Sequence, residues 1–392
     1  MKQKVYLITE YYHSNQNTTG YLFGKLYEAL NEQGDIDLTL IAKKDVNCPE
    51  YKNAYYLNAK EPNKNNLLKR FFYELSISFS FLIQILKTVK KDSTVFTGTT
   101  PIFLLFVLFF VKKIFNFRWI LLVHDVFPEN LVAANILRKD QILFKFSKKV
   151  FDRIYADADE IIVIGKDMQD LVSRKTCKDN ITIVQNWIDS SDIGVEDKKN
   201  NKILKELNWL NNESTVFQFF GNIGRVQGVD IILKAIQKMD YLHLARFLFI
   251  GDGAYVNQLK EQIEKLNLPN IIYYGALDQK DKTSGLNACD IALVTLAEGM
   301  LGLGVPSKTY FSMAANKPIL AIMEPASEVS DMIQTHHIGW VVPPNCVDEL
   351  SKTLDEIVLA KCHYNLSSPR DILDEYYSEK VAMTKILKII RK

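Results

Sequence analysis

Three glycines lie where an apolar run gives way to helical periodicity. The stretch VFQFFGNIGRVQGVDIILKAI holds them at Gly221, Gly224 and Gly228. Glycines at a strand-to-helix turn let the backbone approach a phosphate, and the N–H groups opening a helix over 228–238 would face the anion. The spacing G-x-x-G-x-x-x-G matches neither the dinucleotide fingerprint nor the P-loop. The alternative is a tight turn that needs glycine only for packing.

A histidine and an aspartate follow directly on another apolar run. His124 and Asp125 come after RWILLV, residues 118–123, and the carboxyl end of such a strand is where an open α/β sheet binds its ligands. An imidazole there could serve a reacting centre, while Asp125 could bind a substrate hydroxyl or orient His124. The alternative is a hydrogen-bonded His–Asp pair that secures the following turn.

The elements that must position these residues alternate along the whole chain. Short β-like runs are separated by segments of helical period, which predicts a parallel α/β fold with two Rossmann-like halves and a polar join near 188–214. The strands are expected at 5–9, 37–42, 93–98, 118–125, 160–165, 181–186, 215–221, 245–253, 270–275, 290–295, 317–322 and 339–344. The last segment, from Ser368 and Pro369 onward, has the pattern of one helix.

Composition narrows the class of protein. The chain has 392 residues and 47% hydrophobic content, enough for two domains with cores. The 48 basic and 46 acidic residues nearly balance, which argues against a nucleic-acid binder. The five cysteines are scattered without a C-x-x-C pair, as expected for reduced thiols in a cytosolic chain. The N-terminus leads directly into a strand, so no signal peptide is expected.

Two apolar segments raise the question of a membrane. The run IFLLFVLFFV, residues 102–111, is about half as long as the ~20 residues that span a bilayer. We expect a buried helix there; a membrane-dipping segment is the alternative. Residues 64–91 form an aromatic helix candidate with Lys and Arg beside Phe71, Phe72 and Tyr73. Such a helix could lie on an anionic lipid surface. It could equally be a buried helix whose basic ends are solvated.

Taken together, these motifs resemble the GT-B glycosyltransferases over about residues 1–390. The chain resembles the retaining family 4 of these enzymes. Within that family it is most similar to the bacterial branch that includes N-acetylfucosamine-type transferases of surface-polysaccharide assembly. It is carried by LLVHDVFPE, DADEIIVIG, ITIVQNWID, FFGNIGRVQGVDIIL, FIGDG, IIYYGAL, NACDIALV, VPSKTYFSMAANKPILAI and IGWVVPP. It implies two Rossmann-like domains that face each other across a cleft: an acceptor-side domain over 1–190, a nucleotide-sugar domain over 191–370, and a C-terminal helix over 371–392 crossing back to the first.

The resemblance also implies a reaction. The enzyme would transfer a hexosyl or N-acetylhexosaminyl group, with retention, from a nucleotide-diphosphate donor, expected to be a UDP-sugar. The acceptor would be a glycan or a polyprenyl-diphosphate-linked glycan of a capsule or O-antigen. The nucleotide-sugar is a substrate, no cofactor or metal is implied, and the location is cytoplasmic, free or peripheral on the inner face of the membrane. A nucleotide-sugar epimerase and a catalytically silent partner subunit remain alternatives.

The site residues that the resemblance implies fall in both halves. The catalytic candidates are His124, Asp125, Arg225 and Lys308, and the donor-binding candidates are Thr19, Gly20, Gly221, Asn222, Gly224, Gln227, Gly228, Gly251, Gly275, Glu298, Ser307 and Tyr310. Many relatives have Arg and Lys where this chain has Asn222 and Gln227. Charge on the leaving diphosphate must therefore be neutralised by Arg225 or by Lys308, whose helix Ser307 would open. The alternative for either is a solvated surface cation.

Other positions depart from the pattern or invite different chemistry. The second of the family's paired glutamates falls on Phe311, and Glu298 either stands in for the first or is a surface carboxylate. Thr18, Thr19 and Gly20 match a small-residue loop that borders the donor phosphates. Asp157-Ala-Asp159 has the form of a D-x-D metal motif but precedes a strand, and His336–His337 lacks a third ligand at metal spacing. No metal site is expected at either.

Overall fold

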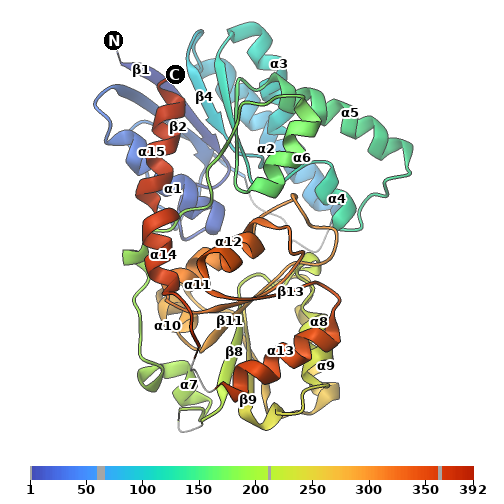
Figure 1. Cartoon of the computed structure of the whole chain (residues 1–392). Helices are drawn as coiled ribbons and strands as arrows, with labels where there is room; N and C mark the ends of the chain where they lie inside the picture. Colours follow the sequence, from blue (N-terminus) through green and yellow to red (C-terminus); the bar gives the residue numbers. More distant parts are fainter. Residues whose placement is uncertain (1, 60–66, 211–212, 361–363) are drawn as a thin grey trace. The chain divides into compact units, whose positions relative to one another are not determined.

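The computed structural model describes residues 2–59, 67–210, 213–360 and 364–392. The chain divides into two compact units, each built on one parallel sheet (Figure 1). Unit 1 comprises Met1–Asn186, Gly302–Gly304 and Glu379–Lys392, and unit 2 comprises Trp187–Leu301 and Val305–Ser378. The α/β architecture expected from the alternating pattern is confirmed.

Unit 1 has a seven-stranded sheet in the order β3-β2-β1-β4-β5-β6-β7. The strands are β1 (Gln3–Thr9), β2 (Ile36–Lys43), β3 (Ala54–Leu57), β4 (Thr94–Thr97), β5 (Arg118–Val123), β6 (Glu160–Val163) and β7 (Ile181–Ile183). The central strands are buried almost throughout, because helices cover both faces of a parallel sheet. The sequence did not predict β3, a four-residue edge strand that is only partly buried.

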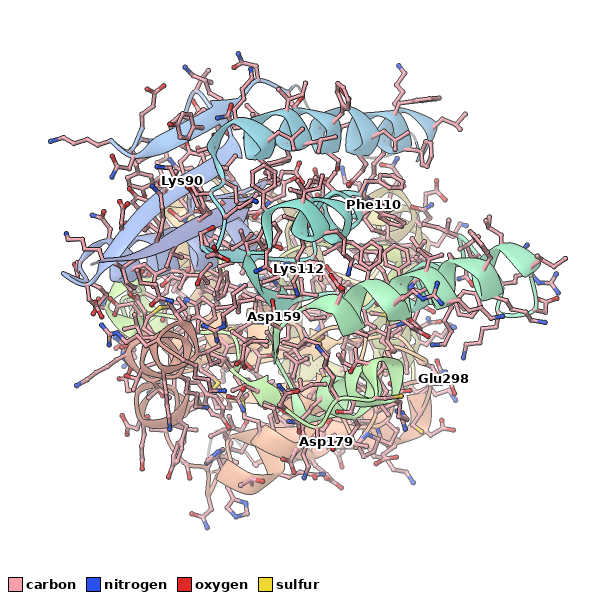
Figure 2. The ribbon with its side chains drawn as sticks, turned by 90° about the horizontal axis from the view of Figure 1, so that it is seen from above. Lys90, Phe110, Lys112, Asp159, Asp179 and Glu298 are labelled. Carbon is pink, nitrogen blue, oxygen red and sulfur yellow. The ribbon has the colours of Figure 1, made fainter. Side chains whose placement is uncertain are left out.

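The helices of unit 1 lie in two groups. They are α1 (Thr18–Asn31), α2 (Leu67–Thr88), α3 (Leu104–Phe115), α4 (Glu129–Ala133), α5 (Ile142–Asp157), α6 (Lys166–Thr176) and α15 (Glu379–Ile390). Helix α1 packs beside α15, whereas α2, α3, α5 and α6 form a row of neighbours (Figure 2). Right-handed crossovers place α1 on one face of the sheet and that row on the other.

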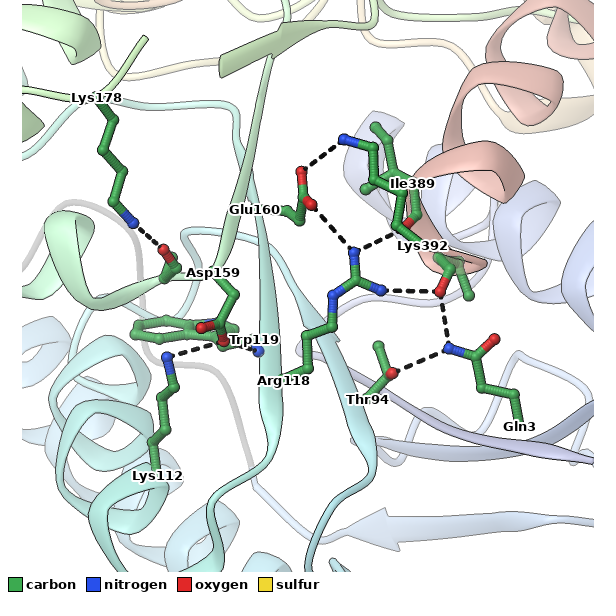
Figure 3. A network of polar contacts seen from close by, with 12 residues as sticks. Gln3, Thr94, Lys112, Arg118, Trp119, Asp159, Glu160, Lys178, Ile389 and Lys392 are labelled. Atoms are coloured by element: carbon green, nitrogen blue, oxygen red, sulfur yellow. Dashed lines mark hydrogen bonds and ion pairs between the residues drawn. The ribbon is translucent and has the colours of Figure 1, made fainter. Parts of the chain in front are cut away.

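The C-terminal helix is anchored to the sheet of unit 1 (Figure 3). The Arg118 guanidinium donates to the carbonyls of Ile389 at 2.7 Å and Ile390 at 2.9 Å. The Gln3 amide also donates to the Ile390 carbonyl, at 2.7 Å. The Glu160 carboxylate pairs with Arg118 at 3.2 Å. These bonds satisfy the last carbonyls of α15, which have no partner inside the helix.

The final segment is not one helix, as the sequence predicted, but two. Helix α14 (Pro369–Tyr376) belongs to unit 2, and α15 begins at Glu379. Between them, Ser378 pairs as an isolated bridge with Ile188, and the Tyr377 hydroxyl lies 3.1 Å from His336 Nε2. The extended backbone that the bridge needs interrupts the helical turn.

Unit 2 has a six-stranded sheet in the order β10-β9-β8-β11-β12-β13. The strands are β8 (Thr215–Phe220), β9 (Ala245–Ile250), β10 (Ile271–Gly275), β11 (Ile291–Thr295), β12 (Ile319–Ile322) and β13 (Gly339–Val342). The helices are α7 (Lys202–Glu206), α8 (Asp230–Ile236), α9 (Val256–Leu266), α10 (Lys282–Leu286), α11 (Lys308–Ala314), α12 (Glu328–His336), α13 (Val347–Leu359) and α14. The rings of Phe217 and Phe247 stack 5.1 Å apart across β8 and β9, within the core.

The two apolar segments are both helices of unit 1, and neither is fully buried. Helix α3 buries Leu104, Leu105, Leu108 and Val111, but Phe110 is 63% exposed. The expectation of a buried helix over 102–111 is therefore wrong for the side that carries Phe110, because only the side with the four buried residues packs against unit 1. Helix α2 covers most of the 64–91 prediction, of which 64–66 lie outside the described residues. Among the described residues, no helix is both long and apolar enough to cross a bilayer.

Candidate functional site

The glycine loop leaves β8 at Gly221 and is held from the side by the neighbouring strand end. The Gly221 N–H donates to the Ile250 carbonyl at 2.9 Å, and the Ile223 N–H donates to the Asp252 carbonyl at 2.9 Å. Gly221 has φ +130, which favours glycine because it has no Cβ. The loop is therefore fixed before any ligand arrives.

The backbone of Gly251 packs directly against this glycine loop. A Cβ on Gly251 would lie 1.8 Å from the Gly221 carbonyl oxygen, and its φ is +140. Its N–H donates to the Gly275 carbonyl at 2.9 Å. In unit 2, then, Gly251 lets two strand-end loops touch, and this close backbone contact supplies a packing reason for the glycine.

The turn after the loop differs from the expected helix over 228–238. Residues Arg225–Gln227 form a short 3-10 turn, Gly228 is left-handed at φ +61, and α8 begins only at Asp230. A Cβ on Gly228 would lie 3.5 Å from the Ala297 backbone, so the turn is packed against the chain that follows β11. The side chain of Arg225, one of the predicted cations, lies outside the described atoms.

Lys308, the other predicted cation, meets the glycine loop. Ser307 is the N-cap residue of α11 and Lys308 its first residue, as the sequence predicted. The Lys308 ammonium donates to Gln227 Oε1 at 2.5 Å. It also lies 3.8 Å from the centroid of the Phe219 ring. Two positions 81 residues apart are thus joined at the carboxyl end of β8.

The surroundings of Lys308 lower its affinity for a proton. Burial lowers the pKa of Lys308 to about 7, because the neighbouring ring and amide solvate the positive charge less well than water does. Lys308 is therefore only partly protonated near neutral pH. A phosphate placed beside it would favour the ammonium form, so this group can supply positive charge in response to an anionic ligand.

The remaining donor-binding candidates make different contacts, and in the described part of the chain these contacts do not join them into one cluster with Lys308. Tyr310 is fully buried and packs edge-on against Tyr377 at 6.0 Å, within the core of unit 2. Phe311 is also buried, with the Lys282 ammonium 3.5 Å from its ring centroid. Glu298 is exposed and accepts from the Asn345 amide at 2.7 Å. Asn222 is exposed and lies close to Gly224.

In unit 1, His124 lies directly after β5 with its ring shielded from solvent. The ring packs edge-on to Phe23, with 6.1 Å between centroids. Both ring nitrogens are buried, and among the described residues neither has a hydrogen-bond partner. Burial lowers the pKa of His124 to about 4, so the imidazole is neutral at pH 7. Leaving such polar atoms unpaired costs about 1–3 kcal/mol, which a substrate hydroxyl would recover.

Asp125 does not bond to His124, so both ideas of a coupled pair are wrong. Its carboxylate accepts instead from the Asn130 amide at 2.8 Å. Its N–H donates to the Thr99 hydroxyl at 3.3 Å, and its carbonyl accepts from the Tyr155 hydroxyl at 3.1 Å. Burial raises the pKa of Asp125 to about 6, against the opposing effects of Asn130 and of the Arg70 charge.

The sequence does not predict Asn130, or the ion cluster beside it, as part of the site. Helix α4 carries both Glu129 and Asn130. The Lys175 ammonium, whose side chain is 1% exposed, pairs with Glu129 at 2.8 Å and with Asp152 at 2.6 Å. This cluster ties α4 to α5 and α6 and so positions Asn130 against Asp125. The only local signal was the segment FPEN that follows His124–Asp125.

Thr18, Thr19 and Gly20 form the first turn of α1, and the prediction of a loop there is wrong. The Asn17 side chain caps the helix by accepting from the Gly20 N–H at 2.8 Å. A Cβ on Gly20 would lie 2.3 Å from the His13 carbonyl oxygen, so glycine lets the preceding loop pack on the helix. The helix begins at Thr18, three residues before Tyr21, where the apolar pattern YLFGKLYEALNEQG starts.

Unit 1 also has a pocket of about 890 Å³ at the carboxyl ends of β1, β2 and β3. Its lining is amide-rich and includes two lysines: Tyr11, Asn15, Gln16, Asn17, Lys43, Lys44, Asp45, Val46, Asn58 and Ala59. Beside it, Glu10 accepts from the Tyr73 hydroxyl at 2.5 Å and lies 3.9 Å from the Lys43 ammonium. No motif in the sequence predicts this pocket.

The features that could suggest a metal have other partners. Asp157 pairs with Lys113 at 2.5 Å, and Asp159 pairs with Lys112 at 2.8 Å. Asp159 also accepts from the Trp119 N–H at 2.7 Å (Figure 3). The part of the chain that the structure describes has no group of three His, Cys, Asp or Glu side chains placed to hold a metal ion.

Known proteins resemble both the sequence and this architecture. The family model described as Glycosyl transferases group 1 matches residues 200–371. Over 99% of this chain and 98% of the relative, the sequence is 36% identical to the probable glycosyltransferase WbjE of Pseudomonas aeruginosa. The chain belongs to the group 1 glycosyltransferases. The family expected from the motifs is thereby confirmed at this level.

Solved structures establish the fold of this glycosyltransferase. Sucrose-phosphate synthase from Thermosynechococcus elongatus superposes with a TM-score of 0.77 at 15% identity, covering 100% of this chain and 98% of that one. Alr3699/HepE of Anabaena, in complex with UDP-glucose, superposes with a TM-score of 0.72 at 14% identity and 99% coverage of both chains. The group 1 glycosyltransferase described here has the GT-B fold, with a parallel sheet in each of its two units.

Proposed function

We propose that this glycosyltransferase moves a hexosyl or N-acetylhexosaminyl group from a UDP-sugar, with retention, to a glycan or polyprenyl-diphosphate-linked glycan. The product would be part of a bacterial capsule or O-antigen type polysaccharide. The observation that carries the proposal is the Lys308–Gln227 contact beside the glycine loop. The UDP-glucose complex of the HepE structure supports a UDP-sugar as the donor.

On the donor side, the glycine loop and Lys308 would both bind the leaving diphosphate. The rigid backbone from Gly221 to Gly228 would lie against the phosphates, where fixed dipoles stabilise charge without reorganising. Lys308 would take up a proton as the diphosphate approaches and leave Gln227 for a phosphate oxygen. Neither step needs a metal ion.

At the reacting centre, His124 and Asp125 have different roles. The neutral His124 ring offers one donor and one acceptor nitrogen to sugar hydroxyls. Asp125, fixed by Asn130, is mostly ionised at pH 7 and can accept a hydrogen bond from a hydroxyl of the acceptor.

The amide-rich pocket of unit 1 is our candidate for the more distant sugars of the acceptor. It opens at the same edge of the sheet as His124, because the carboxyl ends of parallel strands share one edge. Asn, Gln and Lys side chains are suited to sugar hydroxyls and to acidic sugar substituents. The protein would act in the cytoplasm, on the inner face of the membrane that carries a polyprenyl-linked acceptor.

A thermal-shift panel of nucleotide diphosphates and their sugars tests the donor. UDP and UDP-sugars should raise the melting temperature, whereas a rise with guanosine or thymidine compounds alone would overturn the UDP assignment. Release of UDP should then depend on an added glycan-lipid acceptor. Release without acceptor would favour an epimerase, and no stabilisation by any nucleotide would favour a silent partner subunit.

A further inference from the structure

Helix α2 has apolar side chains on two opposite sides. Ile77, Phe81 and Ile85 recur every four residues and are fully buried. A second stripe, spaced three and four residues apart, is exposed: Leu68, Phe72, Leu75, Phe79, Ile83 and Leu86. Residues at this spacing form one line along a helix, here on the side away from the buried one. A helix that only covers a sheet would have polar residues along that outer line.

The neighbouring helices extend this apolar surface. Helix α2 packs on α3, and α3 packs on α5. Phe110 projects from α3 (Figure 2) and is 63% exposed, and Phe146 of α5 is 66% exposed. Of the 20 large apolar side chains recorded as exposed among the described residues, seven lie on α2, two on α3 and three on α5. Such a concentration differs from the single exposed residues that any surface has. We call the outer surface of α2, α3 and α5 the apolar face.

The same three helices carry a local excess of positive charge. Their basic residues are Lys69, Arg70, Lys87, Lys112, Lys113, Lys145, Lys148, Lys149 and Arg153, and their acidic residues are Glu74, Asp152 and Asp157. Nine against three gives +6, although the whole chain has a net charge of only +2. The acids are also engaged: Glu74 accepts from the Ile102 N–H at 3.0 Å, and Asp152 and Asp157 pair with lysines. An apolar face bordered by lysines fits an anionic partner.

We propose that the apolar face docks on an anionic lipid bilayer, with α2 lying in the plane of the interface. An apolar stripe bordered by Lys and Arg is typical of helices that lie in the headgroup region. A second copy of the chain fits less well, because an isologous contact would place two surfaces with an excess of basic residues against each other. The docking deepens the proposed function, since a bilayer would present a polyprenyl-linked acceptor.

The position of the face relative to the reacting centre supports this occupant. On α2, the Tyr73 hydroxyl donates at 2.5 Å to Glu10, which directly follows β1, and Glu74 accepts at 3.0 Å from the Ile102 N–H, after β4. The first half of α2 therefore lies at the edge of the unit 1 sheet where the carboxyl ends of the parallel strands, β5 included, come together. A docked bilayer would hold lipid-linked substrate near His124 and Asp125.

Vesicle binding tests the docking without requiring activity. The full chain should float with vesicles of phosphatidylcholine and phosphatidylglycerol and should bind pure phosphatidylcholine vesicles at least tenfold more weakly. Replacing two side chains of the exposed stripe, Phe72→Ser with Phe79→Ser, should lower binding to the anionic vesicles at least tenfold. The matched control is Tyr241→Ser with Leu359→Ser, which removes exposed apolar residues from unit 2 and should leave binding unchanged.

The possible results separate the docking from the proposed function. Equal binding by wild type and by the Phe72→Ser, Phe79→Ser variant would overturn the docking, as would a wild-type dimer in light scattering that this variant abolishes. A UDP thermal shift measured on each variant verifies folding and reports the donor site separately. If UDP raises the melting temperature but the chain does not bind vesicles, only the docking proposal is refuted. If the chain binds vesicles but no nucleotide raises the melting temperature, only the proposed function is refuted.

Discussion

The lowered pKa of Lys308 predicts that donor affinity depends on pH. In the free protein the pKa is about 7, and beside a diphosphate it should return toward its ordinary value of about 10.4. Binding above neutral pH therefore requires uptake of a proton by Lys308. As the pH rises, a smaller fraction of the free protein has that proton, and the affinity must fall.

The size of the effect follows from the two pKa values. Between about pH 6.5 and about pH 8.5, the cost of protonating Lys308 grows enough to weaken donor binding about 25-fold, or about 2 kcal/mol. The unliganded fold responds with the opposite sign. Because the unfolded chain binds this proton more tightly than the native state, the Lys308 contribution to the free energy of unfolding increases as the pH rises from about 7 to about 10.

Isothermal titration with UDP-glucose measures the affinity, because its diphosphate has no phosphate group that titrates in this range. Repeating the titration in buffers of different ionisation enthalpy gives the protons taken up, which should approach one at the upper pH. Lys308→Arg keeps its charge and should show little pH dependence, and Lys308→Met should bind weakly at every pH. A wild-type curve parallel to that of Lys308→Met would refute the reasoning.

Three further predictions, two of them with a control variant, test the site and the residues that support it. Lys308→Ala should lower turnover at least about tenfold, or about 1.4 kcal/mol of barrier, in a UDP-release assay; near-normal turnover would remove Lys308 from the mechanism. Gly251→Ala should cost at least about 2 kcal/mol in denaturant unfolding, because its Cβ meets the Gly221 carbonyl at positive φ. Gly34→Ala, with open space around it, should unfold nearly as wild type, and equal costs would contradict the packing argument. Lys175→Met should cost about 3 kcal/mol, because the half-exposed Lys148 must then serve both Glu129 and Asp152, and Lys148→Met should cost clearly less.

The strands could be predicted because they are buried on both faces. In β4, β8 and β11 every residue, or all but the last, is buried, so the apolar run itself marks the element. Where burial is partial, the pattern fails. The pattern does not predict the edge strand β3, and it does not distinguish the exposed half of α3 from the buried half.

The candidate site was only partly predictable, because its contacts join distant parts of the chain. The sequence indicated both the glycine loop and Lys308, but not that Gln227 would accept from the ammonium of Lys308. Asn130 could not be recognised as the partner of Asp125 without the position of α4, which depends on a lysine 46 residues away from Glu129. Local spacing has no information about such pairs.

The substitution at Gln227 and the burial of Lys308 are two parts of one arrangement. A lysine at position 227 would repel the Lys308 ammonium across the 2.5 Å contact and lower its pKa further. An amide instead accepts from that ammonium and adds no charge. The loop therefore relies on a cation that becomes fully charged only when an anion compensates its burial. Compared with a chain that has lysine at position 227, this site lacks one permanent positive charge that would attract a phosphate. Its charge at Lys308 instead depends on whether the ligand is bound.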